Sequence, residues 1–458
     1  MSKMIGNSIF VYDDASKKIL GVINPDGTQA NFDSSSQFLG SIGKPGQQGF
    51  GAGICPAVLP AGFSAMLGTS DPYSDNYGNY QYSDGSIMVF IPKFYYRLGS
   101  TASVLYAVNG VNTIDIAGID AFPDVASANT AGYALHRAFY NAGVIKDGVF
   151  VDKYLCANNS GIASSLTLGN PLSCNAAHNP FSGLTGLTAG DNIYAGALTA
   201  AKTRGTRFFC NSRFIFSALA LLSVAQGQWS NNSTVCAWYD STGVNNFPKG
   251  NNNNALGDTN DTTLKFISDG YSNASKNGSA SVLAKTTHNG QASGVADLNG
   301  NLWEINTGFI SNGSLYYLLN TGVDIATLTA GNSLSSDAWG AASLAANYTS
   351  IGATYGGLTA SSTQKWFNST AQLFDAALTG NPWAATCAGL PLLTGVSGVV
   401  GTNMMGNDAL YDYRPVDLCP VAGGNWNFGA LAGVWSLSLS DVRGNSLANV
   451  GFRSALYL

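Results

Sequence analysis

The sequence has few charged residues. Only 10% of its 458 residues are Asp, Glu, Lys or Arg, whereas about 25% is usual for a globular protein. The net charge is −5 and there is no basic run, so nucleic acid is not expected as a partner. Hydrophobic residues make up 45% of the chain, which excludes the composition of a disordered protein. Low charge with abundant Gly, Ser, Asn, Thr and Tyr is typical of compact, loop-rich extracellular and virion proteins.

Long apolar runs are also missing. No stretch of 18 or more apolar residues occurs, and a membrane-spanning helix needs about 20, so we expect no membrane insertion. The first residues, MSKMIGNSIFVYDDASKK, have no apolar region after the lysine, which argues against a secretory signal. The densest apolar run, Phe214 to Ala225, has the length of a buried helix.

Cysteine and histidine occur without the spacings of a reactive or metal-binding site. The seven cysteines are far apart and include no CxxC pair, which predicts reduced, buried thiols and no zinc site. His136, His178 and His288 belong to no HExxH pattern, and we interpret them as surface or capping residues. No GxSxG motif or phosphate loop is present, and the scattered carboxylates form a catalytic pair only if the fold brings two of them together. Catalysis therefore has no positive sign in the sequence.

Periodicity and turn signals predict an α+β fold with a few helices among many short strands. Helices are expected at 132–142, at 191–202, and from Asn211 or Ser212 to Ala225. Strands are expected within 6–32, at 86–98 and at 149–156, where β-branched and aromatic residues follow turn signals.

Two segments have little capacity to form a core. Residues 36–60 are rich in Gly and Pro and are predicted to be a linker or an extended arm. We therefore divide the chain into a small β-rich region at 1–60, for attachment or oligomerisation, and a ligand-binding domain at 84–458. Residues 230–289 are polar and rich in Asn, Ser and Gly, which predicts a loop or insertion.

The last segment, 423–458, differs from the rest. Trp426, Trp435 and Phe452 are spaced among Gly, Asn and Ser, and the pair Gly423-Gly424 allows close backbone approach. Aromatic anchors among asparagines indicate irregular loops held on a rigid scaffold. The alternation WSLSLS also fits a half-buried strand with its serines facing outward. Either arrangement makes the segment a candidate recognition surface.

Four pieces of sequence together resemble one family. In chain order they are SIMVFIPKFYYR, DNIYAGALTAAKTRGTRFFCNSRFIFSALALLS, GVADLNGNLWEI and GGNW…RGN…NVGFRSA. They resemble the opening strand, the two helices, the Gly-Asn-Val-Trp-Glu segment and the Gly-Phe-Arg close of the formylglycine-generating-enzyme variant of the C-type lectin fold. The resemblance covers residues 84–458 and implies that fold. The enzyme needs a pair of reactive cysteines near the C-terminus, whereas Cys419 is the only cysteine after Cys387.

The C-terminal frame GGNWN-x-G-x-x-AGVW-x-L-x-L-x-x-VRGN-x-x-x-NVGFRSA is more similar to the variable proteins of diversity-generating retroelements, which include phage tropism determinants. In that family an error-prone reverse transcriptase rewrites template adenines, so that Asn codons are replaced. The resemblance implies seven variable, ligand-binding positions: Phe428, Leu431, Ser436, Ser438, Ser440, Asp441 and Leu447. It also implies a constant scaffold of Trp426, Trp435, Arg443, Asn449, Phe452 and Arg453.

This resemblance implies a binding protein rather than an enzyme, with no catalytic residue. Its partner would be a cell-surface receptor, protein or glycan, and its place the tail-fibre tip of a phage or prophage virion, with a bacterial cell surface as the alternative. A homo-oligomer such as a trimer would add avidity. The rivals are a sulfatase-modifying oxidase and a purely structural virion protein.

No cofactor is expected beyond structural calcium, which relatives of this fold bind near the Asn-Leu-Trp-Glu motif. Asn301 and Glu304 could supply oxygen ligands there. The alternative, which we favour, is a buried Trp303 beside a capped carboxylate, because calcium needs six or more oxygens.

Overall fold

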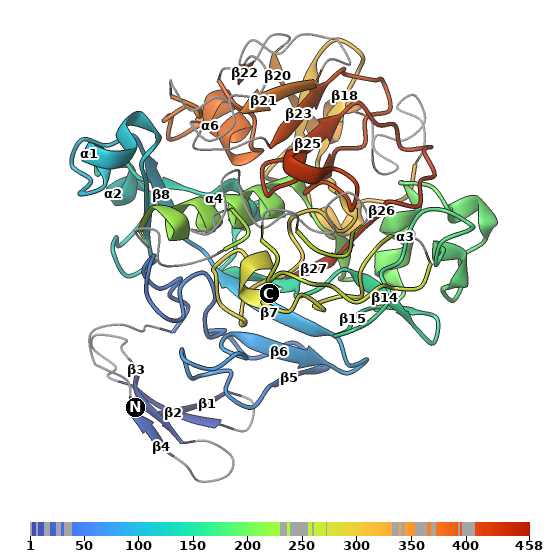
Figure 1. Cartoon of the computed structure of the whole chain (residues 1–458). Helices are drawn as coiled ribbons and strands as arrows, with labels where there is room; N and C mark the ends of the chain where they lie inside the picture. The colour runs from blue at the N-terminus through green and yellow to red at the C-terminus, as the bar shows by residue number, and fades with distance from the viewer. Residues whose placement is uncertain are drawn as a thin grey trace.

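The computed structural model describes residues 2–5, 8–12, 19–23, 29–31, 39–229, 236–238, 255–258, 261–271, 273–331, 339, 344–352, 364–367, 372–392, 394–395 and 408–458 (Figure 1). Many short strands and few helices make up this part of the chain, which confirms the α+β prediction.

Two large sheets organise the fold. The six-stranded sheet has the order β16 (Phe209–Cys210), β27 (Ser454–Tyr457), β13 (Gly148–Asp152), β7 (Ile87–Pro92), β6 (Asn79–Tyr82), β5 (Phe63–Ala65). The seven-stranded sheet has the order β22 (Thr394–Gly395), β21 (Gln364–Phe367), β23 (Ala409–Asp412), β25 (Leu437–Leu439), β24 (Val421–Ala422), β17 (Trp303–Ile305), β26 (Val450–Gly451). The C-terminal segment therefore supplies strands to both sheets.

Smaller sheets surround these two. One four-stranded sheet has the order β1 (Ser2–Ile5), β2 (Ser8–Tyr12), β3 (Ile19–Ile23), β4 (Gln29–Asn31). Two three-stranded sheets have the orders β10 (Ala134–Leu135), β8 (Tyr95–Leu98), β9 (Ile114–Ala117) and β18 (Phe309–Ser311), β19 (Tyr316–Leu319), β20 (Tyr348–Gly352). Two hairpins are formed by β11 (Tyr140–Asn141) with β12 (Val144–Ile145) and by β14 (Cys156–Asn159) with β15 (Ile162–Ser165). The helices are α1 (Tyr106–Asn109), α2 (Val125–Thr130), α3 (Gly196–Lys202), α4 (Arg213–Trp229), α5 (Leu344–Asn347) and α6 (Gly380–Cys387). The strands predicted within 6–32 are confirmed, and the strand predicted at 86–98 is divided between β7 and β8, which belong to different sheets.

Helix α4 is the predicted apolar helix. The Ser212 hydroxyl accepts a hydrogen bond from the Ile215 N–H at 3.1 Å and caps the helix start. Every residue of α4 except Trp229 is buried, and Figure 1 shows the helix crossing the centre of the molecule between the two large sheets. A helix surrounded by protein buries all its faces, which is why its sequence is apolar all round.

The other two helix predictions are corrected. The segment 132–142 contains β10, a 3-10 turn at Arg137–Phe139 and β11, because β10 pairs with β8 and tertiary pairing overrides a modest helical pattern. The predicted helix at 191–202 begins only at Gly196. The N–H groups of Tyr194 and Ala195 donate instead to the carbonyls of Asn445 and Arg443. The strand predicted at 149–156 is divided between β13 and β14.

The predicted linker at 36–60 is wrong for the described residues from 39 onward. Ile42, Phe50 and Ile54 are buried in the same core as the rest of the chain. The Phe50 and Gly51 carbonyls accept hydrogen bonds from the side chains of Asn289 at 2.8 Å and His288 at 2.7 Å. The glycines of this segment, residues 39–60, allow close packing rather than flexibility.

The predicted insertion at 230–289 consists, where it is described, of turns, isolated bridges and a 3-10 helix at Leu283–Thr286. It nevertheless buries Cys236, Leu264 and Lys285. In the described part of the chain, no helix has both the length and the apolarity to cross a bilayer.

Candidate functional site

The C-terminal segment 423–458 begins with a tight turn. Gly423 and Gly424 have φ values of +91° and +81°, a backbone conformation that favours glycine. A Cβ on Gly424 would lie 2.6 Å from the Cβ of Ala432, so no larger residue fits there. After this turn come a 3-10 helix at Gly429–Leu431, then β25, β26 and β27. The paired glycines thus provide the close approach expected from the sequence.

The predicted scaffold residues lie mostly inside. Trp435, Arg443, Phe452 and Arg453 are buried, and Trp426 is 7% exposed. The Trp435 ring packs on Phe374, with 4.9 Å between ring centroids. Asn449 is half-buried, and its carbonyl accepts a hydrogen bond from the Trp303 N–H at 2.9 Å. Their burial is compatible with a constant frame.

Two further aromatic contacts tie the scaffold to the rest of the chain. The Trp426 ring stacks on the His178 ring at a centroid distance of 5.8 Å. The Phe452 ring meets Phe181 edge to face at 5.3 Å. Both partners come from the segment that follows the β14–β15 hairpin.

The side-chain oxygens of Glu304 and Asn301 have hydrogen-bond partners within the protein. Both carboxylate oxygens of Glu304 accept hydrogen bonds from Arg453, at 2.6 Å from Nε and 2.5 Å from Nη2. The Asn301 side-chain oxygen accepts from the Ser275 N–H at 2.9 Å, while its amide donates to the Ser275 carbonyl. Since calcium takes six to eight oxygen ligands, these committed oxygens favour the alternative of a buried Trp303 beside a neutralised carboxylate.

The expected outward orientation of the serines is wrong for Ser436 and Ser438. Ser436 is 0% exposed and Ser438 is 4% exposed. The Ser436 hydroxyl donates to the Leu431 carbonyl and accepts from the Ala409 N–H. Strand β25 pairs with β23 on one edge and with β24 on the other, and its three residues are all buried, so a serine in or next to this strand finds its hydrogen-bond partners within the protein. Alternation of Ser and Leu therefore does not mark an exposed face here.

The remaining predicted variable positions reach the surface. Leu447 is 45% exposed, and the other four are half-buried: Phe428, Leu431, Ser440 and Asp441. The Phe428 ring packs between Trp303 at 4.9 Å and Tyr411 at 6.0 Å. It therefore has a rigid aromatic support.

Polar contacts connect a second group of these positions. The Ser438 hydroxyl donates to the Asp441 carboxylate at 2.6 Å and lies 3.0 Å from the Ser440 hydroxyl. Asn445 donates to the other Asp441 oxygen at 3.2 Å, and burial raises the pKa of Asp441. Leu447 follows on the same loop, with its N–H 3.4 Å from the Cys174 sulfur. The described contacts thus divide the predicted surface into an aromatic part around Phe428 and a polar loop around Asp441.

Sequence reasoning missed two apolar residues beside this loop. Tyr413 is 49% exposed and Val416 is 53% exposed. Their segment adjoins the C-terminal one, because the backbone N–H of Arg414 donates to the Leu439 carbonyl and the backbone N–H of Arg443 donates to the Asp417 carbonyl. No local pattern distinguishes an exposed Tyr or Val from a buried one, so these positions had no signal in the sequence.

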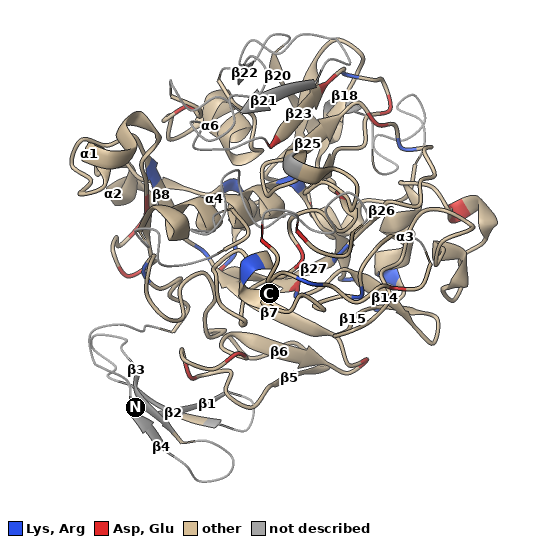
Figure 2. Ribbon diagram, viewed as in Figure 1, with Lys and Arg blue, Asp and Glu red and all other residues tan. Residues whose placement is uncertain are grey.

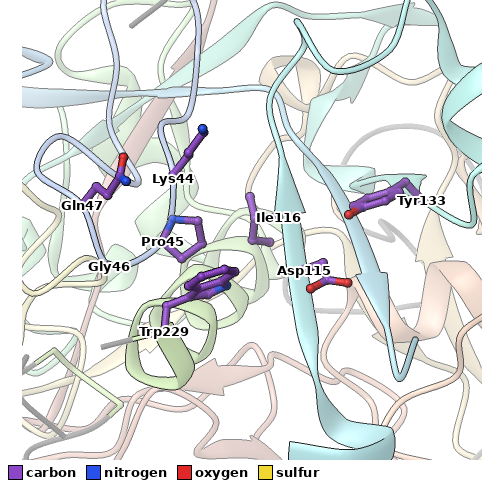
Figure 3. Close-up of a pocket in the computed structure, with 8 residues that line it drawn as sticks. All are labelled: Lys44, Pro45, Gly46, Gln47, Asp115, Ile116, Tyr133 and Trp229. Atoms are coloured by element: carbon purple, nitrogen blue, oxygen red, sulfur yellow. The ribbon is translucent and has the colours of Figure 1, made fainter. Parts of the chain in front are cut away.

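A separate hollow of about 430 Å³ lies beside the C-terminal end of α4 (Figure 3). Trp229 and Tyr133 line it together with residues 44–47. The Asp115 carboxylate at its edge is already committed, to Arg97 at 2.7 Å and to the Ser103 hydroxyl at 2.6 Å. Its described lining includes no residue of 423–458.

Charged and reactive groups are sparse or buried. Figure 2 shows acidic and basic residues scattered over the described ribbon. All seven cysteines are buried, as predicted, and burial raises the pKa of the Cys419 thiol. The histidines are buried as well, so their expected surface placement is wrong. His136 does act as a cap, since its Nδ1 accepts the Ala138 N–H at 3.2 Å.

No protein-family model and no curated protein sequence matches the chain. Among solved structures it is similar to the Major Tropism Determinant U1 variant, with 13% identity and a TM-score of 0.30, over 99% of this chain and 82% of that one. The M1 variant gives 13% identity and a TM-score of 0.31, over 98% of this chain and 85% of that one. The P3c variant gives 12% and 0.30, over 99% and 82%. Likeness at this level assigns neither fold nor function.

Proposed function

We propose that this protein is a diversified receptor-binding protein of the C-type lectin fold, in the variant found in formylglycine-generating enzymes. It acts at the tail-fibre tip of a phage or prophage virion and binds a receptor, protein or glycan, on a target cell. A variable binding protein displayed on a bacterial surface would use the same site.

The observation that carries the proposal is the separation of two residue sets within one short segment. The residues that the sequence frame holds constant are mostly buried, among them Trp435 and Arg453. The positions that the frame leaves open include Phe428, Asp441 and Leu447, which are half-buried or exposed. Diversification is safe where accessible side chains can change without disturbing the frame, because most surface substitutions alter stability by less than about 0.5 kcal/mol.

The accessible set is smaller than the sequence frame alone implies. Ser436 and Ser438 serve the interior of β25, so we assign ligand contact to five positions: Phe428, Leu431, Ser440, Asp441 and Leu447. Tyr413 and Val416 extend this surface as constant apolar neighbours. A few aromatic or apolar anchors ringed by small polar groups are a common composition for a binding surface.

Oligomerisation belongs to the same proposal. A single small variable surface binds weakly, and a homo-oligomer such as a trimer gains avidity when several sites engage together. Since residues 39–55 contribute to the core, attachment or oligomerisation falls to the β-rich residues before them. The oligomeric mass in solution tests this part.

Sequencing of the encoding population tests the diversification. We expect many different residues at the five accessible positions, only small residues at Ser436 and Ser438, and no change at Trp435 or Arg453. The neighbouring DNA should contain a reverse-transcriptase gene and a near-copy of the region encoding 423–458 that differs at adenines. A uniform sequence at all seven positions, without such a copy, would contradict the proposal and leave a structural virion protein.

The oxidase rival has a distinct test. Thiol chemistry needs an accessible thiolate, whereas Cys419 is fully buried and its pKa is raised. We expect no oxidation of a cysteine-containing sulfatase peptide. Conversion of that cysteine to formylglycine would restore the enzyme interpretation.

A further inference from the structure

A second hollow lies beside the β14–β15 hairpin, outside the C-terminal segment. It has a volume of about 520 Å³, within the range of about 300 to 1,000 Å³ typical of small-molecule sites. Its polar lining consists of Asn158 and Ser160 from the hairpin, Asn170 and Asn179 from the segment that follows it, and Tyr271. These residues come from two parts of the chain, 157–183 and Tyr271, so the hollow exists only in the folded protein.

The lining has a consistent chemistry. None of the described residues that line the hollow is charged, and its polar groups are amides, a hydroxyl and a phenol. A phosphate or a carboxylate would meet no cation there, and a metal ion would meet no carboxylate. The lining therefore favours a neutral ligand with many hydroxyl groups.

Tyr271 supplies an aromatic face. The residue is 50% exposed, and one neighbour of its ring is the buried His178, at a centroid distance of 5.5 Å and a tilt of 55°. A half-exposed ring at the edge of a polar hollow can stack on the apolar C–H face of a sugar ring while the amides bind its hydroxyls.

The amides are held in place before any ligand arrives. The Asn179 side-chain nitrogen donates to the carbonyls of Asn170 at 2.8 Å and Pro171 at 2.9 Å, which leaves its oxygen fixed as an acceptor. Asn158 is held by Gly161 at 2.8 Å and Gly183 at 2.9 Å. The Asn170 side-chain oxygen is buried and has no hydrogen-bond partner among the described residues, an arrangement that costs free energy. Such preorganisation reduces the entropy lost on binding.

The hollow is connected to the scaffold of the C-terminal segment. His178 lies between Tyr271 and Trp426 in a continuous row of rings. Its own backbone carbonyl accepts from the Ser173 hydroxyl, which fixes the loop that also carries Asn179. The position of the hollow therefore depends on constant residues, not on those proposed to vary.

From this geometry we infer that the hollow is a constant binding site for a neutral sugar, separate from the variable surface. Because none of its lining residues belongs to 423–458, it stands independently of the proposed function. The two sites would let one molecule combine an invariant glycan contact with a variable receptor contact.

Titration of the full chain with methyl glycosides of glucose, galactose, mannose and N-acetylglucosamine tests the site, by calorimetry and by saturation-transfer NMR. We expect at least one of these neutral sugars to bind in the millimolar range, and the anionic methyl glycoside of N-acetylneuraminic acid to bind at least about tenfold more weakly. Tyr271→Ala should lower the affinity at least about tenfold, and Tyr271→Phe should retain most of it. Tyr73→Ala, at a 79% exposed tyrosine outside the described lining, is the matched control and should bind as the original chain does.

Leu166→Trp offers a second route, because Leu166 lines the hollow and a larger side chain would fill it without removing a polar contact. It should abolish sugar binding while the melting temperature stays near that of the original chain. Absence of binding by all four neutral glycosides would overturn the inference, as would binding that survives both Tyr271→Ala and Leu166→Trp. Either result would leave sequence diversity at 423–458 unaffected, so this failure is distinguishable from failure of the proposed function.

Discussion

Arg453 and Glu304 form a two-point ion pair in the interior, with Nε–Oε2 at 2.6 Å and Nη2–Oε1 at 2.5 Å. The remaining guanidinium hydrogens of Arg453 reach the carbonyls of Asp152, Lys153 and Ala296. One residue of the C-terminal segment thus joins the end of β13, the loop that precedes β17, and β17 itself. Both charges are compensated only while these elements stay together.

Removal of one member of this pair should therefore destabilise the folded protein. Glu304→Gln should lower the free energy of unfolding by roughly 3–5 kcal/mol, because it leaves a buried guanidinium without its counter-charge. Urea unfolding measures the loss. Replacing both residues, as in Glu304→Gln with Arg453→Met, should cost less than the sum of the single changes, since no uncompensated charge then remains. Additive losses would mean that the two side chains do not depend on each other.

The division between frame and surface predicts opposite outcomes at two nearby positions. Trp435→Ala removes a ring that is 1% exposed and should cost about 3–5 kcal/mol of stability. Leu447→Ala changes a 45% exposed side chain and should alter stability by less than about 0.5 kcal/mol. Thermal unfolding of both variants compares them directly. Equal losses at the two positions would remove the basis for treating Leu447 as replaceable.

Size should limit what position 436 accepts. Ser436→Tyr places a large ring in a fully buried site and should destabilise the protein by at least about 1–3 kcal/mol through overpacking. Leu447→Tyr is the matched control and should be neutral. The melting temperatures of the two variants decide the matter, and a tolerated tyrosine at 436 would return that position to the variable set.

His288 should make the fold sensitive to acid. Burial lowers its pKa to about 4, and its Nδ1 accepts the Val295 N–H at 3.0 Å, a bond that needs the neutral ring. The unfolded value is about 6.5, so the unfolded chain binds the proton first and stability is lost as the pH falls from about 6.5 towards 4. At about 1.36 kcal/mol per pKa unit, the loss from this residue is at most about 3 kcal/mol.

Other groups also have shifted pKa values that affect the acid side. The lowered pKa of His136, about 3, acts in the same direction, whereas the raised pKa of Asp297, about 6, opposes it. The informative measurement is therefore the difference in the pH dependence of stability between a His288 variant and the original chain. Urea unfolding from pH 7 to pH 4.5 should give a shallower pH dependence for His288→Gln than for the original chain, and identical slopes would exclude His288 as the cause.

Calcium removal should leave the fold unchanged. Because both Glu304 oxygens accept hydrogen bonds from Arg453 and the Asn301 oxygen accepts one from Ser275, a cation would have to compete with these bonds for the two side chains. Melting curves recorded with a chelator and with added calcium should coincide. A rise in melting temperature with calcium that Glu304→Gln abolishes would restore the metal site.

The sequence by itself determined the features that depend on local chemistry. The apolar run after Ser212 required a buried helix, the wide cysteine spacing indicated buried thiols, and the Gly423-Gly424 pair indicated a tight turn. Each follows from properties of neighbouring residues, and each is present in the structure. The same reasoning identified Trp303, Trp426 and Trp435 as interior anchors, because large rings among small residues are seldom left in water.

Only the tertiary structure decided which side chains are accessible. Ser436 and Ser438 alternate with leucines as an outward face would, yet β25 pairs on both edges and lies covered on both faces. The Gly- and Pro-rich segment 39–55 joins the core through His288 and Asn289, which lie more than 230 positions away along the chain. Burial depends on partners brought from distant parts of the sequence, and no local pattern encodes those partners. For the same reason, only the folded chain brings Tyr271 together with Asn158 and Asn179.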